Sequence, residues 1–410
     1  MKRGNRLRHH DWRISPRHNA LSLRLIRRIR LKQATGNRRT GKTKTSLRAF
    51  SGCLLLLALL DSCYPGVHPR LADRVPAAIQ DDLDPESLRA AVRRSLEFLA
   101  KVPGDRVLAE RPRRVTAQDV KESLLSFLDV MELWDRPEKM AAALRTRFEL
   151  VPFMRDPAEK EILVTGYYQP VIEGSLTPTG AYRFPLYRKP DNLVETFSRR
   201  EIDVLGRLRG KGYEIAWVKD PVELFFLHIQ GSGILRLEDG RTLSVNYAAS
   251  NGRPYTGIGK ILVDEGKLAA EELSAARLLR YLKEHPEERE TLFARNERYI
   301  YFRFVENGPL GSLEVPLTPG RSVAADPDYF PKGAPAFLVS RRPLLDAAGN
   351  LAGWLPFSRF VLNQDAGAAI RGPGRLDLYF GSGAEAGDEA GYMKSDGRLY
   401  FLLRKKSGAE

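Results

Sequence analysis

The chain has 410 residues, of which 43% are hydrophobic and 29% are charged, a composition typical of a soluble globular protein long enough for two domains. Its formal net charge of +15 suggests a nucleic-acid binder, but residues 1–50 hold sixteen Lys or Arg and one acid, Asp11. The rest of the chain carries 50 basic and 50 acidic residues, without a basic helix or zinc-finger spacing. We therefore expect no nucleic-acid partner.

The basic leader continues into an apolar stretch that ends at Cys63 and is too short for a membrane-spanning helix, which predicts a signal peptide over residues 1–63. The letters LDSC at 60–63 resemble a bacterial lipoprotein cleavage box, in which Asp61 is atypical. The only other cysteine is Cys53, so a mature chain starting at Cys63 would keep one thiol, which suits lipidation. A plain secretory signal or a short anchor is the alternative.

Residues 64–83 are Pro-rich and polar and predict a tether. Apolar residues at helical spacing then predict a helix over 84–102, and a second over 116–133 opens with Thr116 three residues before Asp119, an approximate capping box. A third helix is expected after Pro137. We interpret all three as packing elements.

Beyond residue 160 the pattern changes to short alternating or apolar runs separated by Gly, Pro, Asn and Asp, which predicts a β-rich body. One helical interlude, at 269–295, separates two groups of strands. The segments expected to contain strands are 161–174, 214–220, 222–252, 299–304, 335–355, 375–383 and 398–405.

The sequence lacks the residue patterns of several common classes of enzyme. His68, His228 and His285 are scattered and show no metal-ligand spacing, so we expect no metal and no cofactor. The two GSG segments lack the G-x-S-x-G elbow of serine hydrolases. The letters QDAG at 364–367 lack the hydroxyl residue of an aspartic-protease motif and have no second copy.

Two aspartates stand out in QDAGAAIRGPGRLDLYFGSG, residues 364–383. Strand alternation places Leu376 and Leu378 on one face and Asp377 on the other, away from the apolar core. Asp365 lies in a turn-like context, where a carboxylate more often accepts backbone hydrogen bonds than reacts. Asp377 is the preferred candidate acid and Asp365 the alternative.

Four blocks of the sequence closely resemble the membrane-bound lytic murein transglycosylase A family. In that family a double-psi β-barrel is assembled from segments on both sides of a smaller inserted β-domain, and glycan binds in the groove between them. The resemblance implies a mainly β fold with accessory helices, a barrel domain at 84–169 and 306–405, and an insertion at 170–305. The blocks are 164–190, 225–266, 308–335 and 364–403.

The resemblance implies cleavage of the β-1,4 bond between N-acetylmuramic acid and N-acetylglucosamine in peptidoglycan, with a 1,6-anhydro product. It assigns the single acid/base to Asp377 and leaves Asp365 a structural residue near the site. A neighbouring cation would lower the pKa of Asp377, so Arg375 is expected to point elsewhere. The resemblance also implies an outer-membrane lipoprotein that faces the periplasm and is anchored through Cys63. We expect the protein to be a monomer.

The remaining matched blocks are expected to hold glycan strands. Strand alternation in ELFFLHIQGSG at 223–233 predicts that Phe225, Leu227 and Ile229 point inward and Gln230 outward. A peptidoglycan-binding lipoprotein that does not cut is one alternative function, and an extracellular protease with two convergent aspartates is another. The residues expected to contact sugar are Thr165, Tyr167, Tyr168, Gln230, Ser232, Ala249, Asn251, Tyr255 and Lys260.

Overall fold

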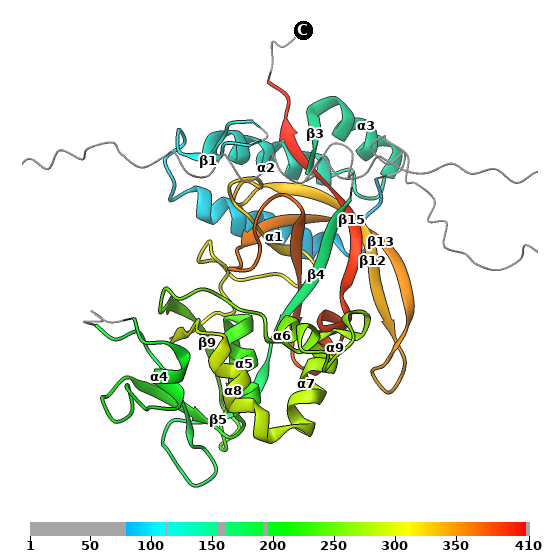
Figure 1. Cartoon of the computed structure of the whole chain (residues 1–410). Helices are drawn as coiled ribbons and strands as arrows, with labels where there is room; N and C mark the ends of the chain where they lie inside the picture. The colour runs from blue at the N-terminus through cyan, green and yellow to red at the C-terminus, as the bar shows by residue number, and fades with distance from the viewer. Residues whose placement is uncertain (1–78, 112, 154–160, 192–195, 407–410) are drawn as a thin grey trace, which may run out of the picture. The chain divides into compact units, whose positions relative to one another are not determined.

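Six strands close into a barrel in the computed structural model, which describes residues 79–111, 113–153, 161–191 and 196–406. The ring runs β12-β13-β11-β14-β4-β15 and is closed by pairing of β12 with β15. Figure 1 labels β12, β13, β4 and β15 of this ring. Two pairs in this ring, β11 with β13 and β14 with β4, are parallel. The barrel strands are β4 (Ile162–Gln169), β11 (Ser322–Ala325), β12 (Pro335–Leu345), β13 (Leu351–Asp365), β14 (Arg375–Ser382) and β15 (Lys394–Arg404).

The barrel is filled by the apolar residues that alternate along its strands. Val164, Phe337, Phe360, Leu376 and Leu378 are all at most 1% exposed and belong to one core. Burial of each such side chain contributes about 1.5–3 kcal/mol. The alternation predicted along 375–383 is therefore confirmed, because Leu376 and Leu378 point into this core.

Helices from the N-terminal part of the described chain complete the same core. They are α1 (Pro85–Leu99), α2 (Ala117–Met131) and α3 (Pro137–Arg147). The capping box of α2 is present, since Thr116 and Asp119 each accept a hydrogen bond from the other's backbone N–H. The three predicted helices are confirmed. Strands β1 (Val107–Ala109) and β2 (Val115–Thr116) pair with each other, β3 (Phe148–Phe153) pairs with β15, and α9 (Ala384–Tyr392) follows β14.

A second sheet is formed by the residues between β4 and β11. Its strand order is β10-β9-β8-β5-β7-β6. The mainly β fold, with a double-psi β-barrel, a smaller β-domain and accessory helices, is confirmed. The strands are β5 (Val171–Ser175), β6 (Phe184–Tyr187), β7 (Glu214–Val218), β8 (Ser232–Arg236), β9 (Thr242–Ser250) and β10 (Ile300–Val305). Its helices are α4 (Arg199–Asp203), α5 (Pro221–Gln230), α6 (Ile258–Asp264), η1 (Ala270–Glu272), α7 (Ala275–Glu284), η2 (Pro286–Glu288) and α8 (Arg289–Arg295).

The strand expected around residues 223–230 is wrong, because this segment is the helix α5. Asp220 caps its first turn by accepting the Val222 N–H, and Pro221 occupies the first helical position. Gly231, at φ 78°, ends the helix in the left-handed conformation that glycine tolerates best. The buried residues of α5 follow helical rather than alternating spacing; they are Val222, Leu224, Phe225, Leu227 and His228. The inward and outward faces assigned by alternation therefore do not exist.

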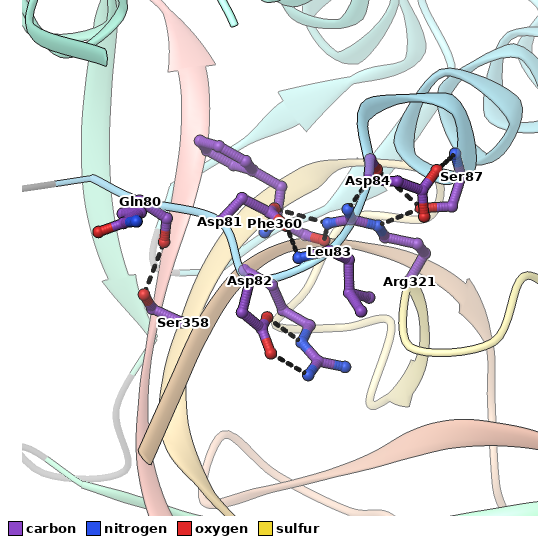
Figure 2. Close-up of polar contacts among 10 residues, drawn as sticks. Gln80, Asp81, Asp82, Leu83, Asp84, Ser87, Arg321, Ser358 and Phe360 are labelled. Atoms are coloured by element: carbon purple, nitrogen blue, oxygen red, sulfur yellow. Dashed lines mark hydrogen bonds and ion pairs between the residues drawn. The ribbon is translucent and has the colours of Figure 1, made fainter. Parts of the chain in front are cut away.

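The segment that leads into α1 is held against the barrel by buried ion pairs. Figure 2 shows Asp81 paired with Arg321, whose Nη1 lies 2.6 Å from the Asp81 carboxylate. Both side chains are at most 2% exposed. Arg321 also donates to the Phe360 and Asp84 carbonyl oxygens, and Asp81 accepts the Phe360 N–H. A second pair, Asp82 with Arg359, is more exposed, so most of this anchoring depends on Asp81 and Arg321.

Two observations bear on the predicted attachment to a membrane. Cys63 and the rest of the predicted leader, signal and most of the tether lie outside the described residues. Within residues 79–406, where the structure describes the chain, no helix has the length and apolar character needed to span a bilayer.

Candidate active site

Asp377 is the third residue of β14, the strand that lies between β4 and β11. Its neighbours Leu376 and Leu378 point into the barrel core, so the carboxyl group faces the other way. On β4 the residue in register with Asp377 is Thr165. The Asp377 side chain keeps 17% of its surface exposed, which leaves it sheltered but reachable.

Thr165 and Arg375 hold the Asp377 carboxylate. The Thr165 hydroxyl donates to Oδ1, and Arg375 Nε lies 3.1 Å from the same oxygen. Arg375 Nε also lies 3.2 Å from the Thr165 hydroxyl oxygen, so the three side chains form a closed triangle. The expectation that Arg375 points elsewhere is wrong. Residues two apart in a strand share one face, and the sheltered face around Asp377 brings the guanidinium onto the carboxylate.

The pKa of Asp377 is nevertheless raised above the ordinary aspartate value of 3.8. Burial is the main cause, because it disfavours the charged form of the carboxyl group. The charge of Arg375 and the hydrogen bonds from Thr165 and Arg375 act in the opposite direction and offset part of this rise. The side chain is thus placed to hold a proton and to have a cation beside it once the proton leaves.

Asp365, the last residue of β13, is held by three donors. Its Oδ1 accepts the Ser312 and Ala366 N–H groups at 2.9 and 2.8 Å, and its Oδ2 accepts the Tyr167 hydroxyl at 3.0 Å. Burial raises the pKa of Asp365 to about 6, while these hydrogen bonds lower it and the charge of Asp377 adds to the rise. The interpretation of Asp365 as an anchor of the chain after β13 agrees with these contacts.

Close backbone packing fixes this part of the site. Gly166, between Thr165 and Tyr167, lies under α9, and a Cβ atom there would be 2.8 Å from the Ala390 Cα. Gly311 packs against the Gln364 carbonyl oxygen, which a Cβ atom would meet at 2.3 Å. These contacts allow β4 to present alternate residues to the two aspartates and allow the Ser312 N–H to reach Asp365.

Several of the predicted sugar-binding residues gather near these aspartates. The ring of Tyr167 contacts that of Tyr379, with centroids 5.3 Å apart. Tyr255 is 39% exposed. Burial of its hydroxyl raises the pKa of that group, and the charges of Arg375 and Asp377 also act on this pKa, the first lowering it and the second raising it. Gln230, at the end of α5, accepts the Tyr168 N–H at 3.2 Å, which links α5 to β4.

The other predicted sugar-binding residues occupy different surroundings. Ser232 begins β8 and is mostly buried, and Ala249 pairs with Tyr301 in the second sheet. Asn251 is 1% exposed, and its amide makes hydrogen bonds with four backbone groups of the protein. Lys260 is exposed on α6 and pairs with Asp264. Their contact with sugar stays a prediction, which for Asn251 the geometry does not favour, because its hydrogen-bonding capacity is used.

Two contributors to the site are not among the site residues predicted from the sequence. Arg375 is two residues from Asp377 in one strand, which places both on one face, but the sequence analysis expects it to point elsewhere because its charge lowers the pKa of the acid. Ser312 carries no local signal, because it acts through its backbone N–H from a loop more than fifty positions away.

Among the described residues, one group of His and Glu side chains is spaced closely enough to hold a metal ion. Ligand atoms of His285, Glu287 and Glu288 lie within 4.8 Å of one another. Glu288 already accepts hydrogen bonds from Lys267 and Tyr281.

The fold and the site together define the class of protein: a closed double-psi barrel that carries a sheltered aspartate and has a second β-domain inserted between its strands. The chain matches two family models, the MltA specific insert domain at residues 163–303 and the 3D domain at 321–403. A crystal structure of a membrane-bound lytic murein transglycosylase from Agrobacterium tumefaciens is 32% identical, with a TM-score of 0.63, and the match covers 78% of this chain and 93% of that one. The chain belongs to the membrane-bound lytic murein transglycosylase A family.

Two further relatives come from Escherichia coli. Membrane-bound lytic murein transglycosylase A of strain K12 is 35% identical over 241 residues, 58% of this chain. That match spans 64% of the length of the E. coli protein. A structure of E. coli MltA with bound chitohexaose is 26% identical with a TM-score of 0.68, covering 81% of this chain and 93% of that one.

Proposed function

We propose that the protein is a lytic transglycosylase that cleaves the β-1,4 bond between N-acetylmuramic acid and N-acetylglucosamine in peptidoglycan and forms a 1,6-anhydromuramic acid end. The observation that carries this proposal is Asp377, a sheltered carboxyl group whose pKa burial raises although Arg375 is in contact with it. Family membership and the names of the relatives support the substrate class.

A single carboxyl group is sufficient for this reaction. Most glycosidases need one carboxyl group as acid and a second as nucleophile or base. Here the C6 hydroxyl of the muramic acid residue attacks its own anomeric carbon, so no outside nucleophile is required. Protonated Asp377 gives its proton to the bridging oxygen as the glycosidic bond breaks, and the carboxylate then accepts the proton of the C6 hydroxyl.

The contacts of Asp377 suit both steps. Burial favours the protonated acid that the first step needs. After proton transfer, Arg375 and Thr165 stabilise the carboxylate through the two contacts to Oδ1. Asp365 keeps its hydrogen bonds within the protein and supports the loop that carries Ser312.

Glycan is proposed to lie over the exposed side of Asp377. The E. coli relative with bound chitohexaose supports binding of a β-linked amino sugar chain. Tyr255, on whose hydroxyl the charges of Arg375 and Asp377 act, offers aromatic surface near the acid. We propose the remaining predicted residues as wider walls of the same site, and 170–305 as the inserted domain that contributes most of them.

We further propose that the protein acts as a monomer anchored by a lipid on Cys63, at the outer membrane and facing the periplasm. The relatives are named as membrane-bound proteins, which supports attachment to a membrane. The lipoprotein-like letters at 60–63 supply the chemical means of attachment.

Digestion of purified murein sacculi by the purified protein tests the proposal. Mass spectrometry of the released fragments should find muropeptides that are one water lighter than hydrolysis products, as a 1,6-anhydro ring requires. Fragments with reducing ends would identify a hydrolase, and binding without any release would identify the non-catalytic lipoprotein.

A further inference from the structure

A cavity of about 900 Å³ lies within the second β-domain, apart from the candidate active site. Its wall is made by β6, α4, β7, α5 and α8, and neither Asp365 nor Asp377 contributes to it. The volume is in the range of pockets that take a ligand of the size of a short peptide. This cavity has no part in the proposed cleavage.

The charged groups of the cavity are mostly cationic. Five arginines and three carboxylates line it. Of the carboxylates, Asp203 lies 3.4 Å from Arg199, and Glu214 accepts the Gly210 N–H. Three of the arginines, Arg183, Arg200 and Arg209, are exposed and form no ion pair with any carboxylate in the described part of the chain. The cavity therefore offers positive charge that the described residues do not neutralise.

Aromatic groups form the rest of the wall. The rings of Trp217, Phe184 and Phe225 all line the cavity. Arg199, only 3% exposed, stacks its guanidinium 5.0 Å from the Phe225 ring and is fixed by the Asn296 and Arg298 carbonyl oxygens. An aromatic wall of this kind, with exposed arginines beside it, suits a ligand that has apolar parts and more than one carboxylate.

We infer that this cavity binds the short carboxylate-bearing peptides that branch from peptidoglycan glycan. The inference rests on the proposed function for the identity of the peptide. Charge complementarity supplies the argument, because such peptides carry free carboxylates beside small apolar side chains, and planar guanidinium groups bind carboxylates in pairs of hydrogen bonds.

The test is a calorimetric titration of the full protein with the free tetrapeptide L-Ala-γ-D-Glu-meso-diaminopimelate-D-Ala. The same peptide with its carboxylates converted to carboxamides measures the contribution of charge. The cavity variant is Arg200→Gln with Arg209→Gln. Its matched control is Arg236→Gln with Arg280→Gln, which removes two exposed charges of the same domain outside the cavity wall.

The wild type and the control should bind the acidic peptide equally. The carboxamide peptide, and the cavity variant with the acidic peptide, should each bind at least about tenfold more weakly, because charge-assisted hydrogen bonds are lost. Quenching of Trp217 fluorescence by the peptide, absent in Trp217→Phe, should locate the binding. Equal affinity of the cavity variant, equal affinity for the carboxamide peptide, or no binding to the wild type would overturn the inference.

Release of anhydromuropeptides, measured on the same preparations, keeps the two proposals separate. Release of anhydromuropeptides without peptide binding would contradict the peptide site and support the proposed function. Peptide binding without release of anhydromuropeptides would contradict the proposed function and support a peptide site in the cavity.

Discussion

Asp365 and Asp377 lie on the two strands that flank β11, and both are in register with the same residue, Ala324. Since neighbouring strands are about 4.8 Å apart, the two aspartates are separated by about 10 Å at the backbone. A two-aspartate protease needs its carboxyl groups within about 3 Å, sharing one proton. The hydrogen bonds of Asp365 and Asp377 go to different partners, which disfavours the protease alternative and gives the two acids separate roles.

Replacement of Asp377 by asparagine should abolish cleavage while leaving the fold intact. Asparagine keeps the size of the side chain and its hydrogen bond from Thr165 but has no proton to deliver. Release of anhydromuropeptides from sacculi should fall by about 10²–10⁴-fold, as expected for loss of a general acid. Binding of chitohexaose, measured by calorimetry, should change little.

Asp365→Asn is the matched control for this experiment. Its amide oxygen can still accept the Ser312 and Ala366 N–H groups, and the Tyr167 hydroxyl can turn to accept from the new amide. Cleavage should stay within about tenfold of the wild type. A stable, glycan-binding but inactive Asp365→Asn, together with an active Asp377→Asn, would show that the acid is Asp365.

The raised pKa of Asp365 predicts how stability depends on pH. Because burial raises the pKa from 3.8 to about 6, the folded state holds this proton more tightly than the unfolded state. Its contribution to the free energy of unfolding is therefore greatest at low pH and declines as the pH rises from about 4 to about 6.5. Relative to Asp365→Asn, the wild type should lose about 2–3 kcal/mol across this window in urea titrations. Parallel curves for the two proteins would contradict the shift.

Much of the fold was predictable because its signals are local. The capping box at Thr116 and the alternation of Leu376 and Leu378 depend on residues a few positions apart, and both predictions are confirmed. The helix α5 was missed because Phe225 and Leu227 suit a buried strand as well as a buried helix. Asp220-Pro221 before the segment and Gly231 after it were the available signals for a helix.

The geometry of the site was less predictable, because it depends on pairing between distant strands. The register that places Thr165 beside Asp377 joins strands more than two hundred positions apart, and no local pattern in the sequence specifies it. The contact of Ser312 with Asp365 depends on a backbone group, which every residue has. The role of Asp377 itself came from the family resemblance, and alternation added only the face on which it lies.

The anchoring of the segment before α1 gives a prediction on stability. Asp81→Asn should lower the free energy of unfolding by about 3–5 kcal/mol, because it leaves the buried Arg321 charge without its partner. Asp82→Asn is the control, since the Asp82 side chain is 32% exposed and water replaces part of what Arg359 loses. Its effect should be about 1 kcal/mol or less in the same urea titration. Equal losses in the two variants would show that burial does not distinguish the pairs.

The proposed lipid anchor is tested by Cys63→Ser. Without a thiol at this position no acyl chain can be attached, so the variant should move from the membrane fraction to the soluble periplasmic fraction. Cys53→Ser is the control and should stay with the membrane fraction. Membrane association of Cys63→Ser equal to that of the wild type would contradict the anchor.

Arg375 should set the pH range of cleavage. Its charge lowers the pKa of Asp377, opposing the effect of burial, so Arg375→Gln should raise that pKa further. Because the first step needs protonated Asp377, the alkaline limb of the kcat profile should move to higher pH by the same amount. The variant also loses the cation that stabilises the carboxylate after proton transfer, so its maximal kcat should fall while KM changes little. Arg371→Gln, an exposed arginine of the preceding loop, is the control and should keep the wild-type profile. An alkaline limb that stays in place in Arg375→Gln would mean that another group limits the reaction, and Asp377 would lose its role as the acid.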